Sequence, residues 1–355
     1  KLDEIYQATS RTWGNHLEKR AWDLPESENG RIVELLSENV LFSLMIGHLL
    51  SGEPAMMTSY EAFFIIILAQ IIQHLKFLEQ CEEVAWRPKY PSVNLLSTST
   101  CWRQDHNGFS HQSPMLISSL LARPGKHVTC FFPVDATAVD PCFNYLLESK
   151  NQVNLVTFNK TDEPVWQDEE AARKNFEQGC SLFEFISNKN QEGNFDYLFV
   201  SAGDIATREA VKAIEILRQD LPKLHLGLIN ISALTYGAIG TSKNPLNQAD
   251  FDQLFGQTAP IIANFHGYPD ALVNILSNYT SKNRISGHGF EEQGSTVTPF
   301  AMLTMNHTSR LNLALDVVKM LGRQDLIEKY KQKLMDYQAY ALEHGTDHPE
   351  LGIIN

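Results

Sequence analysis

The sequence predicts an α/β protein of two domains, each a mainly parallel sheet with helices on both faces. Short β-branched and aromatic runs alternate with helical patterns, which is the order that builds parallel sheets. The 355 residues exceed what one typical hydrophobic core holds. A charged stretch at residues 163–193 separates two such patterns. We therefore expect two three-layer domains, at residues 1–168 and 169–355.

The first domain should begin with two helices. The stretch from Leu2 to about Leu50 is expected to be helical, and apolar residues follow helical spacing after Gly30. Ser59 suits the N-cap of a second helix that ends near Gln80. The Ala62–Ile72 run inside this helix is apolar on all sides, which predicts burial. It is also shorter than the about 20 residues that a membrane span needs.

A βαβ unit is expected after a polar loop at residues 87–113. Two β-branched and aromatic runs, at residues 128–132 and 153–158, predict buried strands around a helix at residues 141–149. The same criteria predict three strands and three helices in the second domain. These are strands at residues 197–200, 224–231 and 260–265, and helices at residues 171–185, 207–219 and 270–279.

The composition excludes some classes of function. A net charge of −13 disfavours nucleic-acid binding, although a small anion needs only a few local cations. The five cysteines are odd in number and form no C-x-x-C pair, so neither a disulfide framework nor a zinc site is expected. With no signal-peptide pattern at its start, the chain is predicted to be cytoplasmic, without membrane or nucleic-acid partners.

The loop Trp102–Gln112 concentrates groups that can do chemistry. His106 and His111 could transfer protons or donate hydrogen bonds, and Asn107 adds an amide. From composition alone, a hydrogen-bonded surface loop is an equally simple interpretation.

Glu38 is a second candidate, because it stands in an otherwise apolar helical pattern and a buried carboxyl makes a good acid or base. A partly exposed helix glutamate remains the alternative. Tyr60, Phe63 and Phe64 lie at helical spacing, which suits core packing or stacking on a planar heterocycle. Lys160 follows a predicted strand, where parallel sheets often bind ligands.

Taken together, these segments resemble the phosphoketolases over essentially the whole chain. The motifs occur in the family's order: Gly30–Glu38, Ser59–Phe63, Arg103–Gln112, Ser201–Asp204, His266–Pro269 and Glu292–Phe300. The family is built like transketolase, and this chain resembles its pyrimidine-binding and C-terminal domains. The family's metal-binding Gly-Asp-Gly motif belongs to a preceding diphosphate-binding domain, so no metal ligand is expected in this chain.

The resemblance implies a role for each candidate. Glu38 would hydrogen bond the pyrimidine of thiamine diphosphate, and Tyr60 and Phe63 would line that ring. His111 and Asn107 would handle the substrate hydroxyls and the loss of water. Lys160 would bind phosphate, as would Lys1, which stands where the family has an arginine.

The implied activity is that of a lyase. Xylulose 5-phosphate or fructose 6-phosphate would be cleaved with inorganic phosphate to acetyl phosphate and an aldose phosphate, with thiamine diphosphate and magnesium as cofactors. The chain alone should be inactive, and a homodimer is expected because its helices carry more apolar surface than one domain buries. Departures from the family at Asn39, Ser113 and Ala301 keep open a second hypothesis, a catalytically silent binding or regulatory module.

Overall fold

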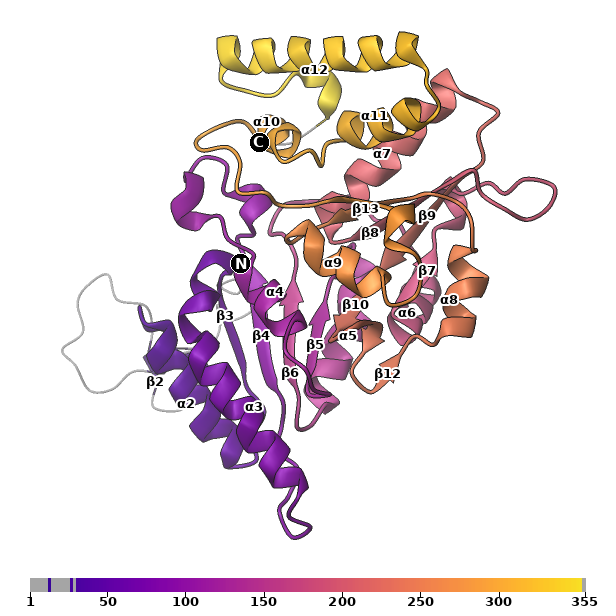
Figure 1. Ribbon diagram of the computed structural model, residues 1–355. Coiled ribbons are helices and arrows are strands. Elements are labelled where there is room, and N and C mark those ends of the chain that lie inside the picture. Colours follow the sequence, from indigo (N-terminus) through magenta and orange to yellow (C-terminus); the bar gives the residue numbers. More distant parts are fainter. Residues whose placement is uncertain (1–11, 14–25, 28–29, 353–355) are drawn as a thin grey trace.

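The computed structural model describes residues 12–13, 26–27 and 30–352, and its core is two sheets that lie side by side (Figure 1). Lys1 lies outside the described residues. A short parallel pair, β1 (Thr12–Trp13) and β2 (Glu26–Ser27), stands apart from both sheets.

The first sheet has seven strands in the order β12-β11-β10-β5-β6-β4-β3. Its four parallel strands come from the first half of the chain: β3 (Met56–Tyr60), β4 (Val93–Thr98), β5 (Val128–Phe131) and β6 (Val153–Thr157). Three antiparallel strands complete it: β10 (Ala233–Thr235), β11 (Ala238–Thr241) and β12 (Asn244–Pro245).

Helices cover both faces of this sheet. On one face lie α2 (Glu38–Leu50), the 3-10 helix η1 (Glu61–Ile67), α3 (Leu68–Glu82) and α4 (Met115–Leu121). On the other lie α5 (Ala136–Glu148) and α6 (Glu169–Gln178). The apolar residues of α2 and α3 pack in one core with Val93 and Leu95 of β4.

Three local predictions for this half are wrong. Residues 31–37 precede helix α2 instead of forming it, because Ser37 caps the helix by accepting the Val40 N–H. Residues 56–60, expected to enter a helix, form strand β3. The loop expected at residues 87–113 contains strand β4, which lies between β6 and the edge strand β3. Its polar residues made it resemble a loop in the sequence. One of them, Asn94, is buried and satisfied across the sheet by the Asn154 amide at 2.8 Å.

The second sheet has five strands in the order β14-β13-β8-β9-β7, all parallel except β7. They are β7 (Cys180–Leu182), β8 (Tyr197–Ala202), β9 (Leu226–Ile231), β13 (Ile261–Phe265) and β14 (Ile285–His288). Helices α7 (Asp204–Asp220) and α11 (Arg310–Met320) cover one face, and α8 (Gln248–Phe255) and α9 (Pro269–Leu276) the other. Helix α12 (Gln324–His344) lies over α10 (Pro299–Met305) and α11 (Figure 1).

Five 3-10 turns complete the described elements: η2 (Cys101–Arg103), η3 (Gly108–His111), η4 (Glu184–Ile186), η5 (Lys282–Arg284) and η6 (Pro349–Leu351).

The two sheets share a hydrophobic core. One cluster of buried residues joins Leu95 of the first sheet to Ile229 of the second. Strands β10 to β12 also carry chain from beyond the predicted boundary at residue 168 into the first sheet. The two-sheet α/β architecture is confirmed, while the boundary itself stays a prediction.

One helix in the described residues is long and apolar enough to cross a membrane. It runs from Glu61 to Glu82, where η1 and α3 join into 22 residues, so the expectation of too short a stretch is wrong on length. A core helix passes the same test, and Phe64, Ile67 and Ile71 are buried against the first sheet. Within the apolar window of this helix, 39% is buried inside the structure, so burial accounts for part of its apolar sequence.

Candidate active site

The candidate residues gather where strands of the first sheet end. Tyr60 is the last residue of β3, the loop from Ser99 follows β4, and Lys160 lies three residues beyond β6. Because parallel neighbours point the same way, their carboxyl ends meet at one edge, which is where open α/β sheets bind ligands.

Four of the predicted site residues form one cluster. The rings of Tyr60 and Phe63 stack, with centroids 5.6 Å apart and planes 3° from parallel. The His111 ring lies 5.9 Å from Tyr60 and 5.3 Å from Phe63. The Lys160 ammonium lies over the Tyr60 ring, 4.9 Å from its centroid. The cluster therefore combines flat aromatic surface, an imidazole and a cation.

Glu38 lies at the first position of α2, where the helix dipole favours a carboxylate. It is half-buried, and its Oε1 accepts a hydrogen bond from the Ser59 hydroxyl at 3.0 Å. Ser59 directly precedes Tyr60, so this bond ties Glu38 to the aromatic cluster. Of the two interpretations of Glu38, the partly exposed helix glutamate describes its burial, and its chemical role remains a proposal.

The polar loop folds upon itself around Gln104. The Asn107 amide donates to the Gln104 side chain at 2.7 Å, and the buried Gln112 amide donates to the Gln104 carbonyl at 3.0 Å. The His111 Nδ1 lies 2.8 Å from the Ser110 hydroxyl. These bonds fix the loop so that His111 lies against the aromatic rings. The Asn107 amide donates its hydrogen bond within the loop in this structure.

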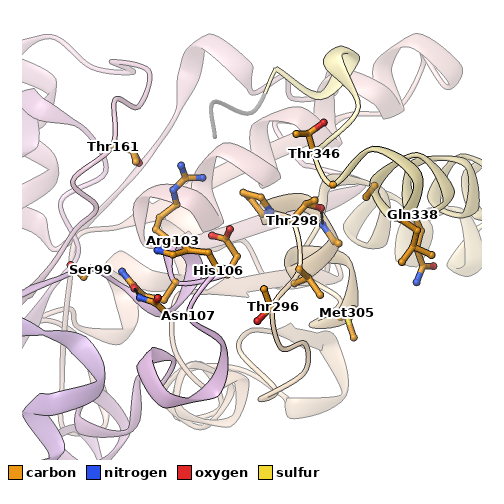
Figure 2. Close-up of a pocket in the computed structure, with 18 of the residues that line it drawn as sticks. Ser99, Arg103, His106, Asn107, Thr161, Thr296, Thr298, Met305, Gln338 and Thr346 are labelled. Atoms are coloured by element: carbon orange, nitrogen blue, oxygen red, sulfur yellow. Dashed lines mark hydrogen bonds between the residues drawn. The ribbon is translucent and has the colours of Figure 1, made fainter.

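A cleft of about 920 Å³ lies beside this loop and is shared by both halves of the chain (Figure 2). Arg103, His106 and Asn107 line one side, and Thr296 and Thr298 line another. The remaining lining residues include Tyr60, Asp105, Lys160, Ala301, Met305, Gln338 and Thr346. Burial raises the pKa of Asp105, so this carboxyl holds its proton more tightly than a free one. The cleft thus offers cations, hydroxyls and amides to an anionic ligand.

Of the predicted site residues that the structure describes, three line the cleft, namely Tyr60, Asn107 and Lys160. Glu38, Phe63 and His111 are not among its lining residues.

Two lining groups were not singled out from the sequence. Arg103 was included only as part of the loop, and Gln338 of α12 carried no signal because it sits in an ordinary amphipathic helix. The threonine-rich segment at residues 292–300 does reach the cleft, through Thr296 and Thr298. Phe64, by contrast, is buried in the core and faces no ligand.

Known families match both halves of the chain. The sequence model described as "D-xylulose 5-phosphate/D-fructose 6-phosphate phosphoketolase" matches residues 1–149, and that of the "XFP C-terminal domain" matches residues 160–354. The chain belongs to the phosphoketolase family. The resemblance inferred from the motifs is thereby confirmed.

Individual relatives agree with this assignment. A "Probable phosphoketolase" of Rhodopseudomonas palustris is 34% identical over 360 residues, which are 99% of this chain and 45% of that protein. Another, of Bradyrhizobium diazoefficiens, is 30% identical over 99% of this chain and 44% of that protein. The chain therefore spans a little under half the length of these phosphoketolases.

Solved transketolases share the fold. A Pichia stipitis transketolase mutant superposes with a TM-score of 0.64 at 12% identity, covering 87% of this chain and 39% of that chain. A protein titled "Split gene transketolase, inactive beta4 tetramer" superposes with a TM-score of 0.56 at 13% identity, covering 81% of this chain and 82% of that chain. The fold of this phosphoketolase-family chain is transketolase-like, as expected.

Proposed function

We propose that this chain forms the pyrimidine-binding and C-terminal part of a thiamine-diphosphate-dependent phosphoketolase. The observation that carries the proposal is the cluster of Tyr60, Phe63, His111 and Lys160 at one sheet edge, with Glu38 tied to it through Ser59. Its substrates would be xylulose 5-phosphate or fructose 6-phosphate and inorganic phosphate. The products would be acetyl phosphate, an aldose phosphate and water.

The residues present fit the aminopyrimidine of the cofactor. Tyr60 and Phe63 are only partly buried and stack in parallel, so they offer a flat apolar surface to a planar ring. Glu38 offers a carboxyl group, which can hydrogen bond a ring nitrogen and shift a proton onto or off it. When bound, thiamine diphosphate supplies the nucleophilic carbon that the amino acids lack.

The cleft fits a sugar phosphate and a second phosphate. Lys160 and Arg103 bring positive charge, and Thr296 and Thr298 bring hydroxyls. His111 lies against the aromatic pair and can donate or accept a proton where substrate hydroxyls would lie. The proposed loss of water needs such a proton at the departing hydroxyl. We assign that role to His111, with Asn107 as a hydrogen-bond donor.

The magnesium and the diphosphate would be held by residues outside this sequence. Among the described residues, the carboxylate, cysteine and histidine side chains that come together are Glu61, Cys101 and His266, and all three are buried. No open face there could receive a diphosphate, so the part of the relatives that this chain does not span would supply that site.

A silent binding module remains the second candidate, and one observation favours it. Ala301 lines the cleft where the resemblance leads us to expect an aspartate, so the cleft has one carboxylate fewer than in the family pattern. Such a module would bind sugar phosphates without cleaving them. Cleavage by a polypeptide that includes the rest of the family's length would rule it out.

We expect the 355-residue chain to form no acetyl phosphate from xylulose 5-phosphate, phosphate, thiamine diphosphate and magnesium. The physical reason is that the diphosphate needs a cation and backbone donors, which we assign to the part of the relatives that this chain does not span. A polypeptide that also carries the remainder of the relatives' length should be active. Acetyl phosphate, measured as its hydroxamate, distinguishes the cases, and clear turnover by the short chain would contradict the domain assignment.

The chain should also self-associate as a two-fold homodimer. Val40 and Leu44, one turn apart on α2, are about half exposed, as is Ile66 of η1. The Gln70 amide joins the helices by donating to the Asn39 carbonyl at 3.2 Å, so these side chains can form one apolar surface. A specific interface should bury more than about 1,000 Å². Sedimentation equilibrium should show a concentration-dependent dimer, whereas a single species of 40.1 kDa would contradict this prediction.

A further inference from the structure

Two buried carboxylates join the candidate active site to the second half of the chain. Glu61 and Asp204 are 3% and 5% exposed, and within the described residues neither forms an ion pair with a lysine or arginine. A buried carboxylate costs several kcal/mol unless other groups hydrogen bond to it. The hydrogen-bond partners of Glu61 and Asp204 therefore indicate which segments the two carboxylates hold together.

Glu61 connects three segments that are distant in sequence. It follows Tyr60 directly, so its backbone is continuous with the aromatic cluster. Its Oε2 accepts the backbone N–H of Cys101 at 2.7 Å, where the polar loop begins. Its Oε1 accepts from His266 Nε2 at 2.9 Å, across 205 residues of sequence. One side chain thus fixes the cluster, the loop and the second sheet relative to one another.

His266 strengthens this connection from the other side. It follows β13, its backbone N–H donates to the Ala202 carbonyl at 2.9 Å, and its own carbonyl accepts the Trp102 indole N–H at 2.8 Å. Burial alone would lower the pKa of His266, but the adjacent Glu61 carboxylate overrides burial and raises it. Gly203 makes room for the ring, because a Cβ there would lie 2.7 Å from the His266 Cβ.

Asp204 holds the segment that carries Lys160 against the second half of the chain. Its Oδ2 accepts the backbone N–H of Asn159 at 2.8 Å, and its Oδ1 accepts the Asn159 amide at 2.9 Å. The side-chain Oδ1 of Asn159 in turn accepts a hydrogen bond from the hydroxyl of Thr100, which is next to Cys101. Lys160 is the following residue, so its backbone position depends on this carboxylate.

We propose that Glu61 and Asp204 are positioning residues that hold Tyr60, His111 and Lys160 in their working arrangement against the second half. The catalytic importance of that arrangement rests on the proposed function. The positioning role explains why the Gly203-Asp204 and His266-Gly267 motifs occur in this chain although they lie away from the cleft. It also gives the C-terminal half a defined part in building the site, through two carboxylates that touch no substrate.

A metal site at Glu61, Cys101 and His266 is the competing interpretation. Both Glu61 oxygens already accept hydrogen bonds in the described structure. Burial, followed by the nearby Glu61 charge, raises the pKa of the Cys101 thiol well above its ordinary value, which disfavours the thiolate that binds metals. The purified chain should therefore contain no stoichiometric zinc, and one zinc per chain by elemental analysis would overturn the proposal.

The decisive test compares Glu61→Gln with Asp220→Asn in this chain without cofactor. A glutamine can accept only one of the two hydrogen bonds and turns its NH₂ toward the other donor. Asp220 is a matched control, because it also joins two helices but lies at the opposite end of α7 from Asp204. Two measurements are made, namely hydrogen exchange of residues 99–112 and the ¹³C resonance of the His111 ring, assigned with His111→Gln.

Glu61→Gln should shift the His111 resonance and speed exchange in the loop by about tenfold or more, since each lost buried bond is worth about 1–3 kcal/mol. Asp220→Asn should do neither, even where it lowers the melting temperature. Equal effects of the two variants on the loop would overturn the proposal. If Glu61→Gln fails to fold, two variants of His266 replace it. His266→Gln keeps an N–H donor and should leave hydrogen exchange in the loop slow, whereas His266→Leu should speed it. Equal exchange rates in these two variants would overturn the proposal.

Activity separates this inference from the proposed function. In the longer polypeptide, Glu61→Gln should lower kcat by up to about 10²-fold, the cost typical of a misplaced catalytic group. An inactive wild type would count against the proposed function, while the resonance and exchange measurements would still decide the positioning role. An active wild type whose Glu61→Gln variant matches Asp220→Asn in kcat would reject the positioning role alone.

Discussion

Replacing Glu38 by glutamine should slow proton exchange at the thiazolium carbon of bound thiamine diphosphate by about 10²- to 10⁴-fold, the range typical of general acid–base catalysis. The amide has nearly the same shape as the carboxyl but cannot exchange a proton with a ring nitrogen. Glu38 accepts a hydrogen bond from the Ser59 hydroxyl, and an amide oxygen can accept it as well. The fold should therefore survive the change.

The measurement is hydrogen–deuterium exchange of the cofactor followed by NMR, with the longer polypeptide. Glu53→Gln is the matched control, because Glu53 is exposed in the turn after α2 and carries the same charge. Its exchange rate should equal that of the wild type. A Glu38→Gln variant that exchanges at the wild-type rate would remove Glu38 from the proposed chemistry, whatever its effect on substrate binding.

The largest effect on stability should follow loss of one partner in the buried Glu209–Arg310 ion pair. Glu209 is fully buried, and its carboxylate accepts from the Arg310 guanidinium at 2.8 and 2.9 Å and from the Arg310 backbone N–H at 2.9 Å. Arg310→Met should lower the free energy of unfolding by about 3–5 kcal/mol, because the buried Glu209 carboxylate would keep Arg208 as its charged partner, at the longer distance of 3.3 Å. The pair joins α7 to α11, so their shared core would loosen.

Urea unfolding of the chain measures this loss, and two variants control it. The double variant Glu209→Met with Arg310→Met should recover much of the stability, since an apolar pair leaves no unpaired charge. Asp325→Asn breaks the exposed Arg323–Asp325 pair and should change little. An Arg310→Met chain as stable as the wild type would show that the pair does not hold the two helices together.

The same pair sets a dependence on pH. Burial alone would raise the pKa of Glu209, but Arg310, with help from Arg208, lowers it from 4.5 to about 2. The folded pKa is thus below the unfolded one, so the contribution is complete above pH 4.5 and is lost as the pH falls toward 2. The stability of the Glu209→Met, Arg310→Met double variant should fall less over this range.

The aromatic cluster illustrates how far local sequence can lead. Tyr60 and Phe63 were placed on one face by their spacing, and the 3-10 turn that contains Phe63 does stack them. The same local reasoning misplaced β3 and β4, because Ser59 looks like a helix cap and the polar residues of β4 find their partners on other strands. Propensity reports local preference, whereas pairing between strands depends on segments far away in sequence.

The sequence by itself determined the family and the two-sheet α/β architecture, because motifs and apolar periodicity are local properties of the chain. It also predicted Glu38, Tyr60, Phe63, His111 and Lys160 as site residues, and their roles stay a prediction. Only the tertiary structure decided that four of these lie in one cluster, and that Glu61 bonds to His266 across 205 residues. In the sequence, Glu61 is indistinguishable from a first-turn helix glutamate. Its burial and its partners exist only once two sheets pack together, since the hydrogen bonds that offset a buried charge come from both.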